Sequence, residues 1–68
     1  MKPFVTMIEG GGFQFEWQNG NRHLELEFKT ENTIDWLVDN NNEITTGTTL
    51  NIFEVRELIE WVTEKLEV

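Results

Sequence analysis

Apolar and polar residues alternate strictly on both sides of an Asn19-Gly20 dipeptide, and this pattern constrains the fold more than any other. Residues 13–18 read Phe-Gln-Phe-Glu-Trp-Gln, and residues 22–29 begin Arg-His-Leu-Glu-Leu-Glu-Phe. Asn and Gly tolerate the positive φ of a type I′ turn. The pattern therefore predicts a β-hairpin with strands at 13–18 and 22–29 and with its large apolar side chains on one face.

A turn centred on Asn19-Gly20 also predicts the register of this hairpin. The pairs placed opposite each other are Trp17–Arg22, Phe15–Leu24 and Phe13–Leu26. A shift by one residue would move every side chain to the other face of its strand, so the pattern specifies the register strongly.

Further strands are expected on both sides of the hairpin. Residues 34–39 alternate in the same way, and a short connection would pair Ile34 with Phe28, Trp36 with Leu26 and Val38 with Leu24. The Asp39-Asn40-Asn41-Asn42 run predicts a turn, because Asn and Asp accept left-handed conformations. A short strand is predicted around 43–46, and a polar loop that overlaps its end is predicted at 45–49. An N-terminal strand at 4–8 precedes three glycines.

From Asn51 the apolar spacing changes to three and four residues, which predicts a helix at about 52–67. Asn51 and Glu54 fit a capping box, in which the Glu side chain bonds back to the cap residue. The residues at helical spacing form one apolar stripe: Ile52, Val55, Leu58, Ile59, Val62 and Leu66.

Together these elements predict an α+β fold in a single domain, residues 1–68. We expect a three- to four-stranded antiparallel β-meander with the C-terminal helix packed across one face, so that the aromatic strand face and the helix stripe bury each other. A chain of this size buries only roughly 60% of its extended surface. It has no cysteine, so no disulfide adds stability.

The residue inventory argues against most enzyme chemistry. The chain has no Ser, Cys or Tyr and a single His, so Ser-His and Cys-His nucleophile pairs are excluded. A carboxylate pair would need a cleft, which a flat sheet does not offer. We therefore expect no enzyme activity and no cofactor.

The charge balance bears on the partners of the chain. Thirteen acidic residues face five scattered basic ones, giving a net charge of −8. No basic patch for nucleic acid forms, and we expect no membrane binding. No apolar run reaches the length of a membrane span and no signal peptide is visible, so a cytoplasmic location is expected.

Two acidic surfaces are candidate partner-binding sites. On the helix, Glu57, Glu60, Glu64 and Glu67 share one side with Phe53, and Trp61 lies at its margin. This side is either a solvated face, with both aromatics folding back over the sheet, or an acidic strip with aromatic anchors. On the outer sheet face the candidate residues are Glu16, Glu25, Glu27, Asp35 and Leu37.

Glu27 directly opposite Asp35 is an unfavourable pair of like charges. Either Lys29 and solvent relieve the repulsion, or a basic partner or a cation does so. The predicted register also puts Glu16, His23 and Asp39 in one row, which resembles a metal-ligand set but is more typical of a surface ion pair. No metal site is predicted. Asp39–Glu43 begins like a calcium loop, but Ile44 and Leu50 replace its required Gly and Glu.

Short motifs give a resemblance to small bacterial and phage proteins to which no activity is assigned. These motifs are Gly10-Gly11-Gly12-Phe13-Gln14-Phe15-Glu16-Trp17, Arg22-His23-Leu24-Glu25-Leu26-Glu27 and Leu58-Ile59-Glu60-Trp61. The resemblance covers roughly two thirds of the chain and implies a bacterial or phage origin.

Three functions are compatible with the sequence. The first is a non-enzymatic protein-interaction module, a subunit or regulator that acts through its acidic and aromatic surfaces and forms a homodimer. The second is a phage-type inhibitor that mimics nucleic-acid charge against restriction or CRISPR nucleases. The third is a divalent-cation-binding protein that uses the sheet carboxylates.

Overall fold

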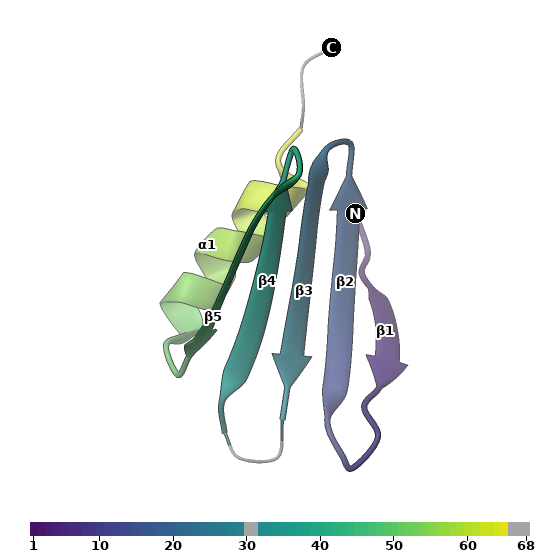
Figure 1. The fold of residues 1–68 in the computed structure, drawn as a ribbon, viewed down its shortest axis with the longest axis vertical. Coiled ribbons are helices and arrows are strands. Elements are labelled where there is room, and N and C mark those ends of the chain that lie inside the picture. The colour runs from purple at the N-terminus through teal and green to yellow at the C-terminus, as the bar shows by residue number, and fades with distance from the viewer. Residues whose placement is uncertain (30–31, 66–68) are drawn as a thin grey trace.

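The structure, a computed structural model, describes residues 1–29 and 32–65. One antiparallel sheet in the order β1-β2-β3-β4-β5 carries a single helix on one face (Figure 1). The elements are β1 (Phe4–Met7), β2 (Phe13–Asn19), β3 (Arg22–Phe28), β4 (Ile34–Asn40), β5 (Glu43–Thr49) and α1 (Ile52–Thr63). The α+β meander with a C-terminal helix is confirmed, and the sheet has five strands where three to four were expected.

The β2–β3 register differs from the predicted one, because the turn is centred on Gly20 and Asn21. Asn19 pairs with Arg22, and the apolar pairs are Phe13–Phe28, Phe15–Leu26 and Trp17–Leu24. Gly20 has φ 60° while Asn21 is not at positive φ, which matches a type II′ turn with Gly at its first central position. In the expected register Trp17 faced Arg22. The observed register instead gives every large apolar side chain of β2 an apolar partner on β3, without changing the face on which it lies.

The β3–β4 register is the predicted one, with Leu24 opposite Val38, Leu26 opposite Trp36 and Phe28 opposite Ile34. The Asn-rich run forms the β4–β5 turn, as expected. Asn41 and Asn42 have φ of 53° and 73°, which is a type I′ conformation. The Asn42 N–H donates to Asp39 Oδ1 at 2.9 Å.

The ends of the sheet correct two predicted bounds. β5 continues to Thr49, so residues 45–49 are strand and not a loop. Threonine is β-branched and fits a half-exposed strand even though it is polar. β1 ends at Met7 and not at Ile8. The three glycines connect β1 to β2, and the Ile8 N–H donates to the Gly12 carbonyl across this connection.

The core lies between the sheet and α1, as the apolar patterns predicted. Leu24 and Leu26 of β3 and Val62 of α1 are fully buried. Trp17 and Val55 are also buried, and partly buried aromatics of β2, β3 and β4 pack around them. The thin core therefore depends on side chains from the middle strands and from one side of the helix.

The helix begins at the predicted cap, but its cap geometry differs from a capping box. The Asn51 side chain accepts a hydrogen bond from the Phe53 N–H at 2.9 Å. The Asn51 N–H donates to the Thr49 hydroxyl at 2.9 Å, in place of the expected bond to Glu54. Ile52 is 63% exposed, so the apolar stripe starts at Val55. The helix ends at Thr63, earlier than residue 67, and Leu66 lies outside the described residues.

The C-terminal end of α1 is held by the β2–β3 hairpin. Asn19 Nδ2 donates to the carbonyls of Val62 and Glu64 at 2.8 Å each. Arg22 Nη1 donates to the Trp61 carbonyl at 2.8 Å, and its guanidinium lies over the Trp61 ring. These side chains satisfy carbonyls that a helix end leaves without a partner, and the Arg22 charge complements the helix dipole. No basic residue lies in the last helical turn itself.

Candidate interaction surface

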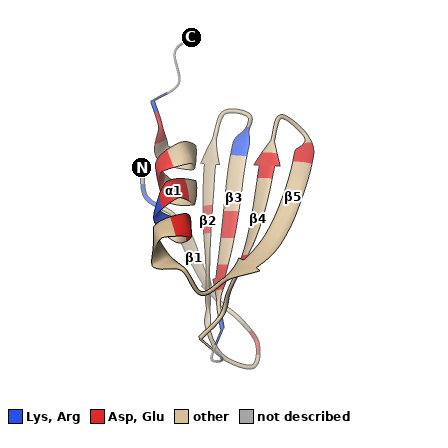
Figure 2. Ribbon diagram, turned by 90° about the vertical axis from the view of Figure 1, so that its left-hand side faces the viewer, with Lys and Arg blue, Asp and Glu red and all other residues tan. Residues whose placement is uncertain are grey.

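The outer face of the sheet, opposite the helix, is acidic. Five carboxylates project from its described strands: Glu16, Glu25, Glu27, Asp35 and Asp39. Carboxylate positions are found on the helix as well as on the strands (Figure 2). The like-charge pair Glu27–Asp35 is present as predicted. The expected row of Glu16, His23 and Asp39 is wrong, because the corrected register places Gln18 opposite His23 and Glu16 opposite Glu25.

Glu16 and Glu25 are a second pair of like charges, and the Gln14 amide lies between them. Gln14 Nε2 donates to Glu16 Oε1 at 2.6 Å and to Glu25 Oε1 at 2.9 Å. His23 Nε2 lies 3.4 Å from Glu25 Oε2. These contacts reduce the repulsion between the two glutamates.

Lys29 relieves the other like-charge pair, which was one of the two alternatives. Its Nζ lies 2.7 Å from Asp35 Oδ2 and 3.8 Å from Glu27 Oε2. The Thr48 hydroxyl donates to Asp35 Oδ1 at 2.7 Å. The hydrogen bonds from Lys29 and then from Thr48 hold the pKa of Asp35 below its ordinary 3.8, although partial desolvation opposes them. Both carboxylate oxygens of Asp35 are therefore fixed by a neighbouring side chain, Oδ2 by Lys29 and Oδ1 by Thr48.

An open hollow of about 350 Å³ lies between Glu25 on one side and the Glu27–Asp35 pair on the other. Its lining residues are Glu25, Glu27, Asp35, Trp36 and Leu37, together with Thr46, Gly47 and Thr48 of β5. Four of the sequence-predicted site residues thus meet in one place, whereas Glu16 lies beside the hollow. We refer to this depression as the outer-face hollow.

The acidic side of α1 is partly neutralised within the molecule. Arg56 Nε lies 3.0 Å from Glu60 Oε1, one turn along the helix. Arg22 Nη1 lies 2.8 Å from Glu64 Oε2. Glu64 follows the helix as its C-cap, and Glu67 lies outside the described residues. Of the predicted row of helix glutamates, Glu60 and Glu64 are therefore paired with arginines, and Glu64 lies just beyond the last helical residue.

The two helix aromatics lie in different surroundings. Phe53 is 70% exposed, so it does not fold back over the sheet. Trp61 is partly buried, packs against the core and lies beneath the Arg22 guanidinium, 5.2 Å from its ring centroid. Of the two, only Phe53 presents a large apolar surface to solvent.

A second hollow, of about 300 Å³, lies beside the helix and was not foreseen. Trp36, Glu54, Glu57 and Leu58 line it. The sequence pattern assigned Trp36 to the core, because alternation shows only which face a residue occupies and not how much of it the helix covers. Glu57 was a candidate residue, but Trp36 could have been found only from the path of the helix across the sheet.

In residues 1–29 and 32–65, no three His, Asp or Glu residues lie close enough together to hold a metal ion. Asp39 uses one carboxylate oxygen to accept the Asn42 N–H in the β4–β5 turn. That segment is therefore a turn with a local side-chain bond, as its sequence predicted.

Comparison of the chain with protein-family models, with curated proteins and with solved structures found no match. The resemblance to small bacterial and phage proteins stays a prediction. Within the part of the chain that the structure describes, no helix has the length and apolar content needed to span a membrane.

Proposed function

We propose that this chain is a non-enzymatic protein-interaction module that binds a basic, partly apolar segment of a partner protein in the outer-face hollow. The supporting observation is the hollow itself, where Leu37 lies among three carboxylates. A carboxylate-lined depression favours arginine and lysine side chains, and an apolar centre adds contact area that a purely ionic surface lacks.

The internal contacts of the hollow leave it acidic. Lys29 supplies one positive charge to Glu27 and Asp35, so that pair keeps a net negative charge. Among the described residues, Glu25 is contacted by the Gln14 amide and by the His23 ring. An incoming guanidinium would therefore find two acceptors on β3, Glu25 directly opposite Leu37 and Glu27 opposite Asp35. The Lys29 ammonium already occupies the place of a divalent cation between Glu27 and Asp35, which favours a protein partner over the cation-binding alternative.

The test is a titration of isotope-labelled protein with a short synthetic peptide that carries arginines on either side of a central leucine. Backbone resonances of Glu25, Leu37 and Thr46 should shift, and binding should weaken as the ionic strength rises. A peptide with glutamates in place of the arginines should cause no shift. Shifts spread equally over α1 and the sheet would contradict the proposal, because they would show attraction by net charge alone.

Paired variants separate the outer face from the helix. Glu25→Gln with Glu27→Gln removes two charges from the hollow, and Glu57→Gln with Glu60→Gln removes two from α1. At ~0.5–1 kcal/mol for each exposed ion pair, the first double variant should weaken peptide binding about five- to thirtyfold. The second should leave it nearly unchanged, and an equal loss in both would overturn the assignment to the hollow. Thermal melts of both variants check that the fold is intact.

A further inference from the structure

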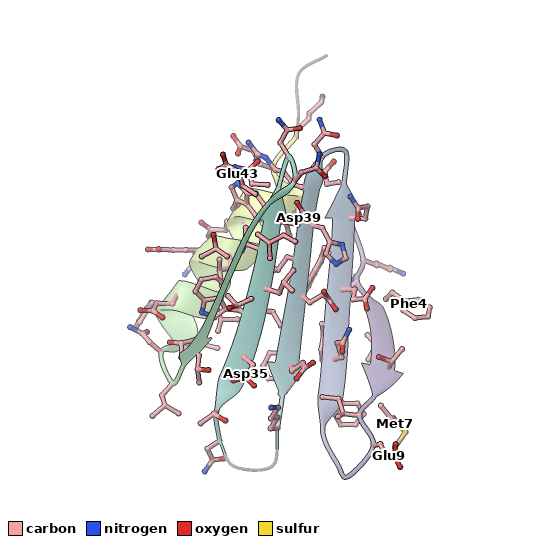
Figure 3. The ribbon with its side chains drawn as sticks, in the orientation of Figure 1. Phe4, Met7, Glu9, Asp35, Asp39 and Glu43 are labelled. Carbon is pink, nitrogen blue, oxygen red and sulfur yellow. The ribbon has the colours of Figure 1, made fainter. Side chains whose placement is uncertain are left out.

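β1 is an edge strand with an exposed apolar surface. It pairs only with β2 in the described sheet, and each of its four residues is exposed. Phe4 is 68% and Met7 81% exposed, and both project away from the sheet beside β1 (Figure 3). An edge strand of this kind offers unpaired backbone groups to another strand.

The alternation of hydrogen bonds between β1 and β2 shows which backbone groups of β1 face the open edge of the sheet. Ile8 donates its N–H to Gly12, and this pair continues the β1–β2 register, in which Thr6 lies opposite Gln14. Alternate residues of an edge strand turn their N–H and C=O groups in opposite directions. Thr6 therefore directs its backbone groups toward β2, whereas Val5 and Met7 direct theirs to the open edge.

The helix leaves the neighbouring sheet surface uncovered. α1 contacts β2, β3 and β5 and ends against the β2–β3 turn. Phe13 lies at the opposite end of β2, on the helix side of the sheet, and pairs with Met7 of β1. Phe13 is half exposed, as is Val5. The open edge is therefore continuous with an apolar patch made of Val5, Met7 and Phe13.

We propose that this edge binds a second copy of the chain, with β1 pairing antiparallel to the same strand about a two-fold axis perpendicular to the sheet. In the proposed register Val5 lies opposite Met7 of the partner subunit, and Thr6 lies opposite Thr6 of the partner subunit on the axis. The N–H and C=O groups of Val5 and Met7 then all find partners. The result is one continuous ten-stranded sheet with both helices on the same side.

Proline 3 selects this register over its neighbour. A shift by two residues would place Val5 opposite Val5 of the partner subunit and Pro3 opposite Met7 of the partner subunit. Pro3 has no N–H, so that arrangement loses a donor at each end of the pairing. A shift by one residue would put the helix side of one copy next to the outer face of the other.

The charges that flank β1 favour a second copy over a different protein. The strand itself is uncharged, with Lys2 before it and Glu9 after it. In the proposed register Lys2 lies opposite Gly10 of the partner subunit, one residue along the chain from Glu9 of the partner subunit, so opposite charges flank the pairing at both ends. The opposite edge strand, β5, begins with Glu43 and consists mainly of threonines, so it offers neither this charge pattern nor an apolar row.

Equilibrium sedimentation of two matched variants tests the interface. The unmodified chain should approach twice its 8.0 kDa mass as its concentration rises. Met7→Lys places a charge on the pairing edge at a residue that is exposed in the monomer, so this variant should stay monomeric. Ile44→Lys makes the same change on β5, where Ile44 is also exposed, and should associate like the unmodified chain. A monomer at every concentration, or equal loss in both variants, would overturn the proposal.

A cysteine probe tests the register, because the chain contains no cysteine of its own. On the axis, Thr6 and Thr6 of the partner subunit form a non-hydrogen-bonded pair whose Cα atoms are about 4.5 Å apart, within reach of a disulfide. Thr6→Cys should therefore form a covalent dimer in a glutathione redox buffer. Phe4→Cys lies about 13 Å from its own copy in this register, at ~3.3 Å per residue, and should remain monomeric. Equal cross-linking of both variants, or cross-linking of Phe4→Cys alone, would refute the register.

Discussion

At the residue scale, Gly47 shows how the sheet accommodates Trp36, an aromatic residue packed against the core. Gly47 of β5 lies opposite Trp36 of β4. A Cβ atom at position 47 would lie only 2.5 Å from the Trp36 ring. The indole therefore lies directly against the β5 backbone, where no other residue type would leave space for it.

Gly47→Ala should lower the free energy of unfolding by about 1–3 kcal/mol, because the new methyl group forces the indole out of its place. Urea denaturation with tryptophan fluorescence as the readout would measure the loss. Thr46→Ala on the outer face of the same strand is the control and should cost much less. Equal losses would show that β5 is sensitive to any change, with no particular role for this contact.

The lowered pKa of Asp35 makes part of the stability depend on pH. A carboxyl whose pKa is lower in the folded state contributes stability that is fully present above its unfolded value and is lost as the pH falls through its folded value. For Asp35 that loss lies below about pH 3.8. Asp35→Asn should thus lower the melting temperature at pH 6, and its difference from the unmodified chain should shrink as the pH falls below 3.8.

The largest cause of that pKa shift can be removed separately. In a Lys29→Met background the ammonium is gone, so Asp35→Asn should lower the melting temperature at pH 6 by less than it does in the unmodified chain. If Asp35→Asn lowers the melting temperature equally with and without Lys29→Met, the Thr48 hydroxyl alone stabilises the Asp35 carboxylate.

At the scale of elements, alternation and helical spacing predict most of the fold. The face of each residue in β2, β3 and β4 follows from a period of two, and Asn51 starts the helix as its side chain predicts. The β2–β3 register was not predictable from the turn residues, because Asn19-Gly20 and Gly20-Asn21 both suit a hairpin. Contacts distant in sequence decide between them, since only the observed turn brings Asn19 and Arg22 together at the end of α1.

The candidate site was predicted to a similar extent. The sequence assigned four lining residues to the correct face: Glu25, Glu27, Asp35 and Leu37. A register shift of two residues leaves every side chain on the same face of the sheet, so the wrong β2–β3 register did not affect this assignment. Thr46 and Thr48 were missed because a polar run without apolar alternation was read as a loop.

The contacts of Arg22 predict its contribution to stability. Arg22→Ala removes two charge-assisted hydrogen bonds at the helix end and the packing on Trp61, and should cost about 1–3 kcal/mol. Arg56→Ala removes an exposed ion pair on the same helix and should cost under about 0.5 kcal/mol. Chemical denaturation of both variants gives the comparison. A loss for Arg22→Ala as small as that for Arg56→Ala would contradict the capping role.

At the scale of the whole molecule, negative charge lies on both sides of a thin core. Glu25 and Glu27 lie on the outer sheet face, whereas Glu54 and Glu57 lie on the helix. Lys29 pairs with Glu27 and Asp35, Arg22 pairs with Glu64, and Arg56 pairs with Glu60. The remaining imbalance, a net charge of −8, repels itself in the folded state.

Salt should therefore stabilise this protein. The melting temperature at pH 7 should rise as sodium chloride is increased, since at 0.1 M salt the repulsion between exposed charges more than about 10 Å apart is largely screened. Near pH 4.3, where the sequence has no net charge, the rise should disappear. A melting temperature that falls with salt at pH 7 would show that the internal ion pairs outweigh the net repulsion.

The attachment of α1 at both ends has a consequence for its motion. Its first turn follows β5 through the Asn51 cap, and its last carbonyls are bound by Asn19 and Arg22 from the hairpin tip. Most helices open and close their final turn independently of the rest of the protein. Here local fraying also requires the hydrogen bonds from Asn19 and Arg22 to break. The last helical turn and the tip of the β2–β3 hairpin should therefore open together as one cooperative unit.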